Sequence, residues 1–474
     1  MNPLLAVVFI YPAILVGVSL WRSRAIKSHA DFMVAGRSVP VLLLVGTLVC
    51  TWVGSGSLFG GAGLAYRVGI GELWFSFGGW LGLLVAFFLA PRVRRIAQYT
   101  VPDLLEQRYS PAARLLGTLA IILAYVTIAA YQFRGGGWIL TIVTDGAITP
   151  ETGMYIVCIT IVLFTALAGM MSIVTVDILN GIVITLGILI ALPFMVAAGG
   201  GLGEVMNRLP EGHTSIMGGH NALWVFGVAL PTFLLILGES GMYQKFFSAK
   251  NERAAKLAVV GWIAGTILLE TLIDSVGIFG SVAIPGLTTA QSETIVISVA
   301  LQVLPTLLGV LLLCGAAAIV VSTANSFLLT PATNLIRDVY QRFLNPQATD
   351  RQVLVYTRLL VVVLGILGFV AGNFFPTILA MALWAYTMYG AGITPALLAA
   401  LVWPRATRAG GVTSIAVGMA TTLVWEIVAL RRGVDGDAVY LLGLQTVYPA
   451  LFLSIAALVI VSLMTPAERR PAHG

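Results

Sequence analysis

The stretch LVCTWVGSGSLFGGAG (48–63) decides how this chain is expected to fold. It lies inside an apolar run long enough to cross a lipid bilayer, but glycine interrupts it at positions 54, 56, 60, 61 and 63. A membrane helix must satisfy its own backbone hydrogen bonds, so an opened turn survives only where protein packs around it or where it lines a polar cavity. Two interpretations follow. The glycines form a close-packed helix face, or they mark a discontinuous helix whose free carbonyls hold a cation and whose free N–H groups face a substrate.

Composition assigns the chain to the membrane proteins. Of its 474 residues, 59% are hydrophobic and only 10% are charged, and the mean hydropathy is +0.98. Apolar runs follow one another from end to end, so we predict an all-α integral membrane protein with about 13 membrane-spanning helices. The predicted spans lie near 1–21, 39–66, 72–90, 115–143, 153–169, 180–199, 222–242, 257–284, 296–330, 353–374, 376–403, 411–430 and 446–464. The first of them lacks the basic start and the cleavage site of a signal peptide, so we expect it to be retained.

The placement of Lys and Arg predicts the orientation of the chain in the membrane. With the N-terminus outside, the cytoplasmic loops hold most of the basic residues, and Lys245 is assigned to one of these loops. The outer loops then hold only Arg67, Arg208, Arg431 and Arg432. We therefore expect a plasma-membrane protein with a cytoplasmic C-terminus. Topology explains the net charge of +6, which needs no nucleic-acid partner.

Other classes of function find little support. The cysteines (Cys50, Cys158 and Cys314) lie in apolar segments without CxxC spacing, and the histidines lie in loops or the tail without an HExxH motif. We expect no enzyme activity, no disulfide framework and no obligatory protein partner. Apart from the lipid bilayer, the expected partners are small: a solute and an ion.

A second interrupted span suggests internal symmetry. Five spans after the first break, WVFGVALPTFLLILGESGMY (224–243) contains Pro231, Gly238 and Gly241. An odd offset means that the two segments cross the membrane in opposite directions. Paired Gly/Pro-interrupted segments in two halves indicate an inverted-repeat transporter with a binding site near the middle of the bilayer.

The ninth predicted span carries the polar residues that could complete an ion site. VVSTANSF (320–327) places Ser322, Thr323, Asn325 and Ser326 within about one helical turn. Hydroxyl and carbonyl oxygens suit a hard cation such as sodium. The same side chains can instead bond to their own helix or to a neighbouring one, so both interpretations remain open at this point.

Four segments carry a resemblance to a known family. DFMVAGRSVP (31–40), TVPDLLEQRYSP (100–111), GMMSIVTVDILNG (169–181) and STANSFLLTPATNLIRDVY (322–340) resemble the sodium:solute symporter family, which includes proline, pantothenate, sugar, sialic acid and choline transporters. The CTWVGSG segment looks closest to the choline-transporter branch. The resemblance implies a leucine-transporter-type core of two inverted five-helix repeats. The implied parts are 1–38 (first span and loop), 39–221 (repeat 1), 222–403 (repeat 2) and 404–474 (last spans and tail).

The resemblance also implies where sodium binds. The main site would use the carbonyls of Cys50, Val53 and Ile319 with the hydroxyls of Ser322 and Thr323. A second sodium site, present in some members, would use Asp177, Ser322, Asn325 and Ser326. Asn325 stands where those members carry serine, which puts the second site in doubt.

We expect the solute to contact Trp52, Gly54, Arg134 and Glu239. Arg134 lies in mid-span, where a charge costs at least about 2.5–3.5 kcal/mol and should have a partner. The available acids are Glu239, Glu270 and Asp274. Either Arg134 and Glu239 form a structural pair, or they bind the two ends of a zwitterionic solute. Trp52 could stack on an ammonium group.

These observations predict sodium-coupled symport of a small polar solute by alternating access. A zwitterionic, amino-acid-like or carboxylate solute fits best. The alternatives are proton coupling through Asp177, Glu239 or Glu270, uptake of choline or another quaternary amine, and a transporter-derived sensor.

Overall fold

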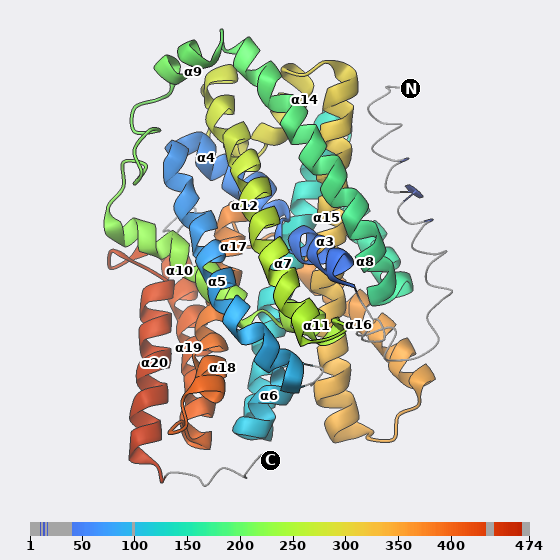
Figure 1. The fold of residues 1–474 in the computed structure, drawn as a ribbon, viewed down its shortest axis with the longest axis vertical. Coiled ribbons are helices and arrows are strands. Elements are labelled where there is room, and N and C mark those ends of the chain that lie inside the picture. Colours follow the sequence, from blue (N-terminus) through green and yellow to red (C-terminus); the bar gives the residue numbers. More distant parts are fainter. Residues whose placement is uncertain are drawn as a thin grey trace.

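A computed structural model of the chain describes residues 40–96, 100–432 and 440–466, with a few isolated positions before residue 40. Nearly all of the described chain is helical (Figure 1). The helices in the first half are α3 (Val41–Trp52), η2 (Gly56–Gly61), α4 (Ala62–Val68), η3 (Gly69–Glu72), α5 (Leu73–Ile96), α6 (Val101–Arg108), α7 (Pro111–Val143), α8 (Pro150–Ala198) and α9 (Leu202–Arg208).

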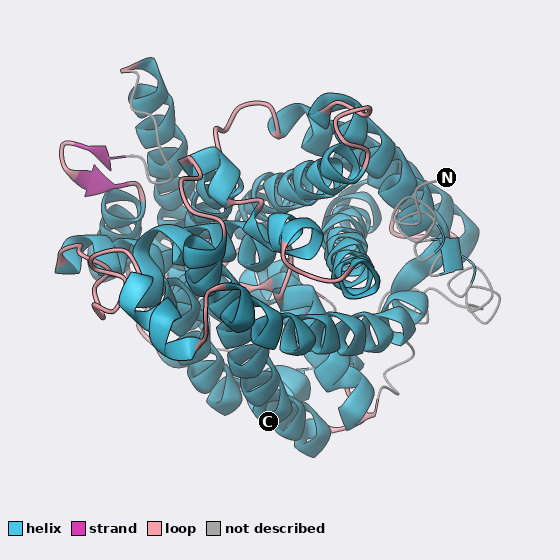
Figure 2. Cartoon of the chain, turned by 90° about the horizontal axis from the view of Figure 1, so that it is seen from above, coloured by secondary structure: helices cyan, strands magenta, loops and turns pink. Residues whose placement is uncertain are grey.

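The second half of the described chain is also mostly helical. Its helices are α10 (Ala222–Gly238), α11 (Ser240–Ser248), α12 (Glu252–Ala283), α13 (Thr289–Ser292), α14 (Ile295–Gln302), α15 (Thr306–Leu335), η4 (Ile336–Leu344), α16 (Asp350–Ala371), α17 (Ile378–Gly392), α18 (Thr394–Val402), α19 (Arg408–Arg431) and α20 (Val447–Met464). The view from above shows a short hairpin of β1 (Tyr440–Leu441) and β2 (Leu444–Gln445) at the edge of the described chain (Figure 2).

The predicted fold class is confirmed. Within the described residues, 10 helical stretches are long and apolar enough to cross a membrane, and the shorter apolar helices Val41–Trp52 and Pro150–Ala166 add to them. Together they cover every predicted span except 1–21, which lies almost entirely outside the described residues.

Two predicted boundaries differ from the structure. The predicted spans 153–169 and 180–199 lie in one helical run, α8, because no proline interrupts the sequence between them. The predicted span 296–330 is divided into α14 and α15, since Pro305 caps a new helix. The connection between the predicted spans 180–199 and 222–242 contains the short helix α9.

Local sequence explains where many helices begin. Side-chain oxygens of Thr100, Ser110, Asn251 and Thr377 accept backbone N–H groups at the first turns of α6, α7, α12 and α17. In α6 and α7 a proline also occupies the first turn, where its missing N–H costs nothing.

The functional centre lies where α15 crosses the core. All its residues from Leu312 to Asn334 are buried, and α15 packs against α7, α8 and α3. The helices α19 and α20 pack against each other at one side of the molecule, beside α17 (Figure 1). The broken helices therefore meet α15 inside protein and away from lipid, as irregular backbone at membrane depth requires.

Candidate functional site

The second span is broken where the glycine-rich stretch predicts it. Helix α3 ends at Trp52, and Val53 adopts an extended conformation with ψ of 101°. The chain then resumes a helix that begins with the π-helical turn η2. At this break the carbonyl oxygens of Cys50 and Val53 face α15, where they accept the Thr323 hydroxyl.

The ninth span supplies a hydroxyl to this break. Thr323 Oγ1 lies 3.1 Å from the carbonyl oxygen of Cys50 and 3.3 Å from that of Val53. Ile319 lies one turn away on α15, and Ile319, Ser322 and Thr323 are all at most 2% exposed. The five residues expected to form the main sodium site thus gather on these two facing elements.

The spacing of these oxygens suits a hard cation. Oxygen ligands of calcium lie about 2.3–2.6 Å from the ion, so two of them at right angles are roughly 3.3–3.7 Å apart. The distances from Thr323 Oγ1 to the two carbonyl oxygens, 3.1 and 3.3 Å, approach this range. A small relaxation would let the hydroxyl turn its lone pairs toward an ion.

Gly54 makes the approach of the three elements possible. A Cβ atom on Gly54 would lie 2.7 Å from both Gln132 Nε2 on α7 and Thr323 Cγ2 on α15. A larger residue would therefore displace these side chains. The close packing supports the interpretation of Gly54 as a packing residue, and its contact with the solute stays a prediction.

The residues expected at a second sodium site are described only in part, so this site stays a prediction. Asn325 Oδ1 accepts a hydrogen bond from Thr165 on α8, and Ser326 Oγ lies 3.2 Å from Thr51 Oγ1. Asp177 lies in α8, but its side chain is outside the described residues.

A buried lysine lies beside Thr51, the neighbour of Ser326. Lys245 is 2% exposed; its ammonium group donates to Thr51 Oγ1 and, at 2.9 Å, to the carbonyl oxygen of Thr47. The sequence assignment of Lys245 to a cytoplasmic loop is wrong, because α11 continues past the second break and carries this residue into the core. Its helical position beyond the glycines of 238–241 is the signal that could have placed it there.

The seventh span is also broken as predicted. Helix α10 ends at Gly238, α11 begins at Ser240, and Glu239 between them has ψ of 112°. The Glu239 carboxylate accepts the backbone N–H groups of Gly241 and Met242 and the hydroxyl of Tyr125. Glu239 therefore caps α11, and its oxygens are already occupied.

Arg134 does not pair with Glu239. Its guanidinium donates to the carbonyl oxygen of Phe375, 2.9 Å away, and Glu293 is near enough for its charge to act on it. Tyr125 is the residue of α7 that reaches Glu239. Arg134 lies nine residues further on, about 13 Å along the helix axis, so the expected pair cannot form.

Trp52 lies among aromatic rings. It stacks on Tyr386 with ring centroids 6.5 Å apart and meets Trp262 edge-on at 6.4 Å. Its indole N–H donates to Glu270 Oε1 at 2.9 Å. Trp52 thus connects the first break to α12 and α17.

A small cavity lies between the two breaks. Its volume is about 10 Å³, and Thr51, Trp52, Glu239, Lys245 and Trp262 are among the residues that line it. Such a space holds about one water molecule. The space between the two breaks is therefore too small for an organic molecule.

Two polar atoms beside the first break have no partner among the described residues. They are Gln132 Nε2 and Ser55 Oγ, and both residues are fully buried. Gln132 Oε1 accepts the backbone N–H of Ser55 at 2.9 Å, which fixes the amide so that its N–H₂ group points at the break. Sequence reasoning missed both residues, since a glutamine and a serine in apolar helices carry no local signal of a shared site.

Comparisons with known proteins identify the family of the chain. The model of the sodium:solute symporter family matches residues 32–418. The chain belongs to this family. The symporter is 26% identical to the sodium/pantothenate symporter of Escherichia coli (strain K12), over 95% of this chain and 94% of that one. It is 24% identical to the sodium/proline symporter of the same strain, over 97% and 92%.

Solved structures show the fold of the symporter. A sodium-coupled sialic acid symporter in a substrate-bound outward-open state matches with a TM-score of 0.80 at 16% identity, and 99% of each chain is covered. Mhp1, a nucleobase-cation-symport-1 family transporter, matches with a TM-score of 0.61 at 14% identity, over 94% of this chain and 97% of that one. The chain is thus a multi-pass, sodium-coupled solute symporter with a leucine-transporter-type fold.

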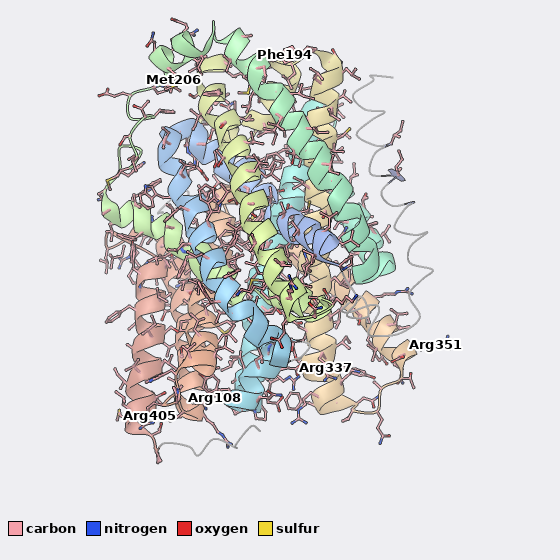
Figure 3. The ribbon with its side chains drawn as sticks, viewed as in Figure 1. Arg108, Phe194, Met206, Arg337, Arg351 and Arg405 are labelled. Carbon is pink, nitrogen blue, oxygen red and sulfur yellow. The ribbon has the colours of Figure 1, made fainter. Side chains whose placement is uncertain are left out.

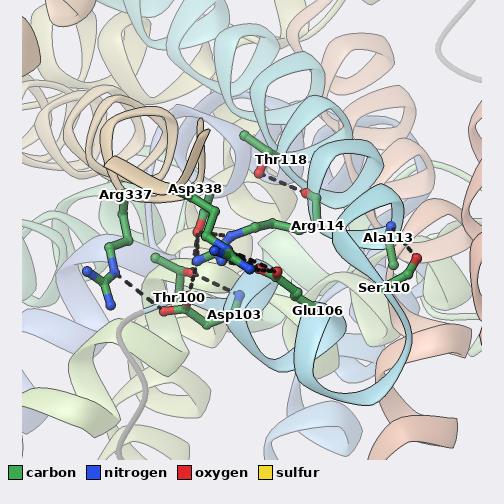
Figure 4. Close-up of polar contacts among 10 residues, drawn as sticks. Thr100, Asp103, Glu106, Ser110, Ala113, Arg114, Thr118, Arg337 and Asp338 are labelled. Atoms are coloured by element: carbon green, nitrogen blue, oxygen red, sulfur yellow. Dashed lines mark hydrogen bonds and ion pairs between the residues drawn. The ribbon is translucent and has the colours of Figure 1, made fainter. Parts of the chain in front are cut away.

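The symporter also has an ion-pair network that joins α6, the start of α7 and η4 (Figure 4). Arg114 at the start of α7 binds the carboxylates of Asp103, Glu106 and Asp338, and Arg342 binds Glu106 at 2.8 Å. Burial opposes the charge of Glu106, but hydrogen bonds from Arg342 and Arg114 outweigh burial and lower its pKa. The ionised Glu106 therefore stabilises the folded protein at neutral pH, and this stabilisation is lost only when the pH falls below the ordinary range of a carboxyl group.

Proposed function

We propose that the symporter imports a small carboxylate-bearing solute together with one sodium ion. The observation that carries the ion site is the Thr323 hydroxyl, which faces the carbonyl oxygens of Cys50 and Val53 at the break of the second span. Ile319 and Ser322, on the same buried stretch of α15, would complete the set of ligands. Sodium in this place joins α3 to α15.

The solute class rests on the donors beside the ion site. Gln132 Nε2 and Ser55 Oγ are buried and have no hydrogen-bond partner among the described residues, and Ser55 starts the second half of the broken span. In such discontinuous helices the positive end of a half-helix points at anionic groups of the substrate. A carboxylate would accept from both side chains and from the helix terminus. Proline and pantothenate, which the named relatives carry, each bear one carboxylate.

Access to this site requires a change of shape. The cavity of about 10 Å³ between the two breaks is too small for an organic solute, so the helices around it must move apart before a solute can bind there. Sodium and solute would enter when one side opens and leave when the other does. The breaks at Val53 and at Glu239 support the proposed division into repeats at 39–221 and 222–403, which would move against each other.

The basic end of the molecule would face the cytoplasm. Arg108, Arg337, Arg351 and Arg405 all lie at one end, opposite Phe194 and Met206 (Figure 3). Cytoplasmic ends of membrane proteins carry an excess of Lys and Arg. We therefore propose that the symporter lies in the plasma membrane with its C-terminus inside the cell and its N-terminus outside.

The proposal is tested by a thermal-shift screen of the purified protein. Proline, pantothenate, other amino acids, simple carboxylates and choline are added in sodium or in potassium. We expect a carboxylate to raise the unfolding midpoint in sodium only. In Gln132→Leu this response should disappear, while sodium alone still stabilises the protein. Stabilisation by choline and by no carboxylate would contradict the proposal and favour a quaternary-amine transporter.

The position of the Lys245 ammonium group predicts that one sodium ion binds to each protein molecule. Its ammonium group already lies beside Thr51, the partner of Ser326, so a cation at the second expected site would meet a like charge. We expect equilibrium binding of radioactive sodium to saturate at one ion per protein, both in the wild type and in Ser326→Ala. Two ions in the wild type and one in the variant would show that the second site exists and that the proposed stoichiometry is wrong.

A further inference from the structure

Three carboxyl groups are buried together outside the ion site and the solute site. Glu270 and Asp274 lie one turn apart on α12, and Glu72 ends η3. Their exposed fractions are 3%, 3% and 0%. Within the part of the chain that the structure describes, no Lys or Arg forms an ion pair with any of them. Charged carboxylates buried in this way need some other stabilisation.

Glu270 has that stabilisation. Its Oε1 accepts hydrogen bonds from Trp52 Nε1 at 2.9 Å and from Ser57 Oγ at 3.4 Å, and its Oε2 accepts from Trp80 Nε1 at 2.6 Å. Donors directed at both oxygens favour the charged form of a carboxyl group. These donors favour the charged form of Glu270 against the cost of its burial.

Glu72 and Asp274 are in a different position. Their carboxyl groups are in hydrogen-bonding contact with each other, and within the described part of the chain the other donor to Glu72 is the Ser76 hydroxyl at 3.3 Å. Glu72 Oε2 and Asp274 Oδ2 are buried and receive no hydrogen from any other described group. Ionised carboxylates only accept hydrogen bonds. Two of them facing each other without water would repel and leave both oxygens unsatisfied.

We propose that Glu72 and Asp274 hold one proton between them and form a proton-binding site beside the second span. The proton is bonded to one carboxyl oxygen and is donated to the other group, so the pair carries a single negative charge. This arrangement satisfies the two orphaned oxygens and removes the repulsion. The site is independent of the proposed solute and adds a hydrogen ion to the ligands of the symporter.

The surrounding charged groups do not replace the proton, since each is engaged elsewhere. Arg67 donates to the Thr289 carbonyl and to Ser292, and the His213 ring bonds the Tyr66 carbonyl. Glu293 accepts the backbone N–H groups of Ile378 and Leu379. The nearby charge of Glu270 acts on Glu72 and makes a second negative charge there less favourable.

The two carboxyl groups belong to different parts of the fold. Glu72 follows α4, which continues the glycine-rich half of the second span, whereas Asp274 lies on α12, against which α4 packs. If this half-helix moves away from α12, water enters, the groups separate and each can ionise. Closing then takes up a proton and opening releases it, so acid favours the closed conformation.

Infrared spectroscopy of the reconstituted protein tests the site directly. At neutral pH the wild type should show the carbonyl stretch of a protonated carboxyl group. Asp274→Asn and Glu72→Gln should each remove the same band, because one proton serves both groups. Glu426→Gln, which changes a buried carboxyl group bonded to Thr446 far along the chain, should leave this band in place. A band that survives both substitutions, or two bands each lost in one variant, would overturn the proposal.

Thermal unfolding gives a second measurement that does not depend on the solute. The unfolding midpoint of the wild type should fall as the pH rises from mildly acidic to mildly alkaline, and the fall should be smaller in Asp274→Asn, whose amide N–H replaces the proton at every pH. Sodium should still stabilise this variant, which shows that it folds and keeps the ion site. If the variant follows the wild-type pH profile, the proton site is absent even though the sodium site remains.

Discussion

Sodium should lose most of its affinity for the protein when Thr323 is replaced by valine. Valine keeps the branched shape but removes the hydroxyl that faces the carbonyl oxygens of Cys50 and Val53. A hydrogen bond to a charged group is worth about 1.5–3 kcal/mol, so the loss of a comparable ion contact weakens binding by about 10- to 150-fold. The measurement is the sodium concentration that gives half of the maximal rise in unfolding midpoint.

Thr323→Ser is the matched control, because serine retains the hydroxyl on a smaller side chain. It should keep sodium binding within a few fold of the wild type. If the valine variant responds to sodium like the wild type, α15 contributes only packing at this point. The sodium site would then have to be sought elsewhere in the symporter.

Arg114→Met should cause the largest loss of stability. Arg114 is 4% exposed and binds the carboxylates of Asp103, Glu106 and Asp338. Methionine fills a similar volume but leaves these charges uncompensated, and breaking a buried ion pair in this way costs about 3–5 kcal/mol. We expect a much lower unfolding midpoint and little folded protein after extraction.

Arg342→Met provides the comparison within the same network. Arg342 also binds Glu106, but its side chain is 52% exposed, so water replaces much of the lost interaction. The unfolding midpoint should change only slightly. Equal losses in the two variants would show that the network acts through the number of its ion pairs and that burial of Arg114 has no special effect.

Local signals in the sequence were sufficient to predict the two breaks and the hydroxyl that faces the first. Glycine and proline in an apolar run have few uses other than close packing or an interrupted helix, and Thr323 stands among polar residues in a segment that is otherwise apolar. Each signal lies within a few residues of the feature it predicts. The fold class follows from hydropathy for the same reason.

The other contacts of the site depend on the distances between helices. These distances cannot be read from any single segment of the sequence. Gln132 and Ser55 are ordinary residues until their helices meet. Arg134 and Glu239 looked like partners because both are charges in apolar spans, and only their heights along the bundle separate them. The course of α11 after its break decided whether Lys245 lay in a loop or in the core.

The two breaks differ in how they are held. In the seventh span the chain supplies its own cap, since the Glu239 carboxylate binds the N–H groups of the half-helix that follows it. In the second span the exposed carbonyls face a hydroxyl from another helix and have no charged group of their own. The break at Glu239 is therefore held by the chain itself, whereas we expect the break at Val53 to be completed only by a bound ion. Loss of the ion should therefore loosen the repeat that contains the second span. The repeat that contains the seventh span should keep its conformation, so the two related halves should differ in mobility.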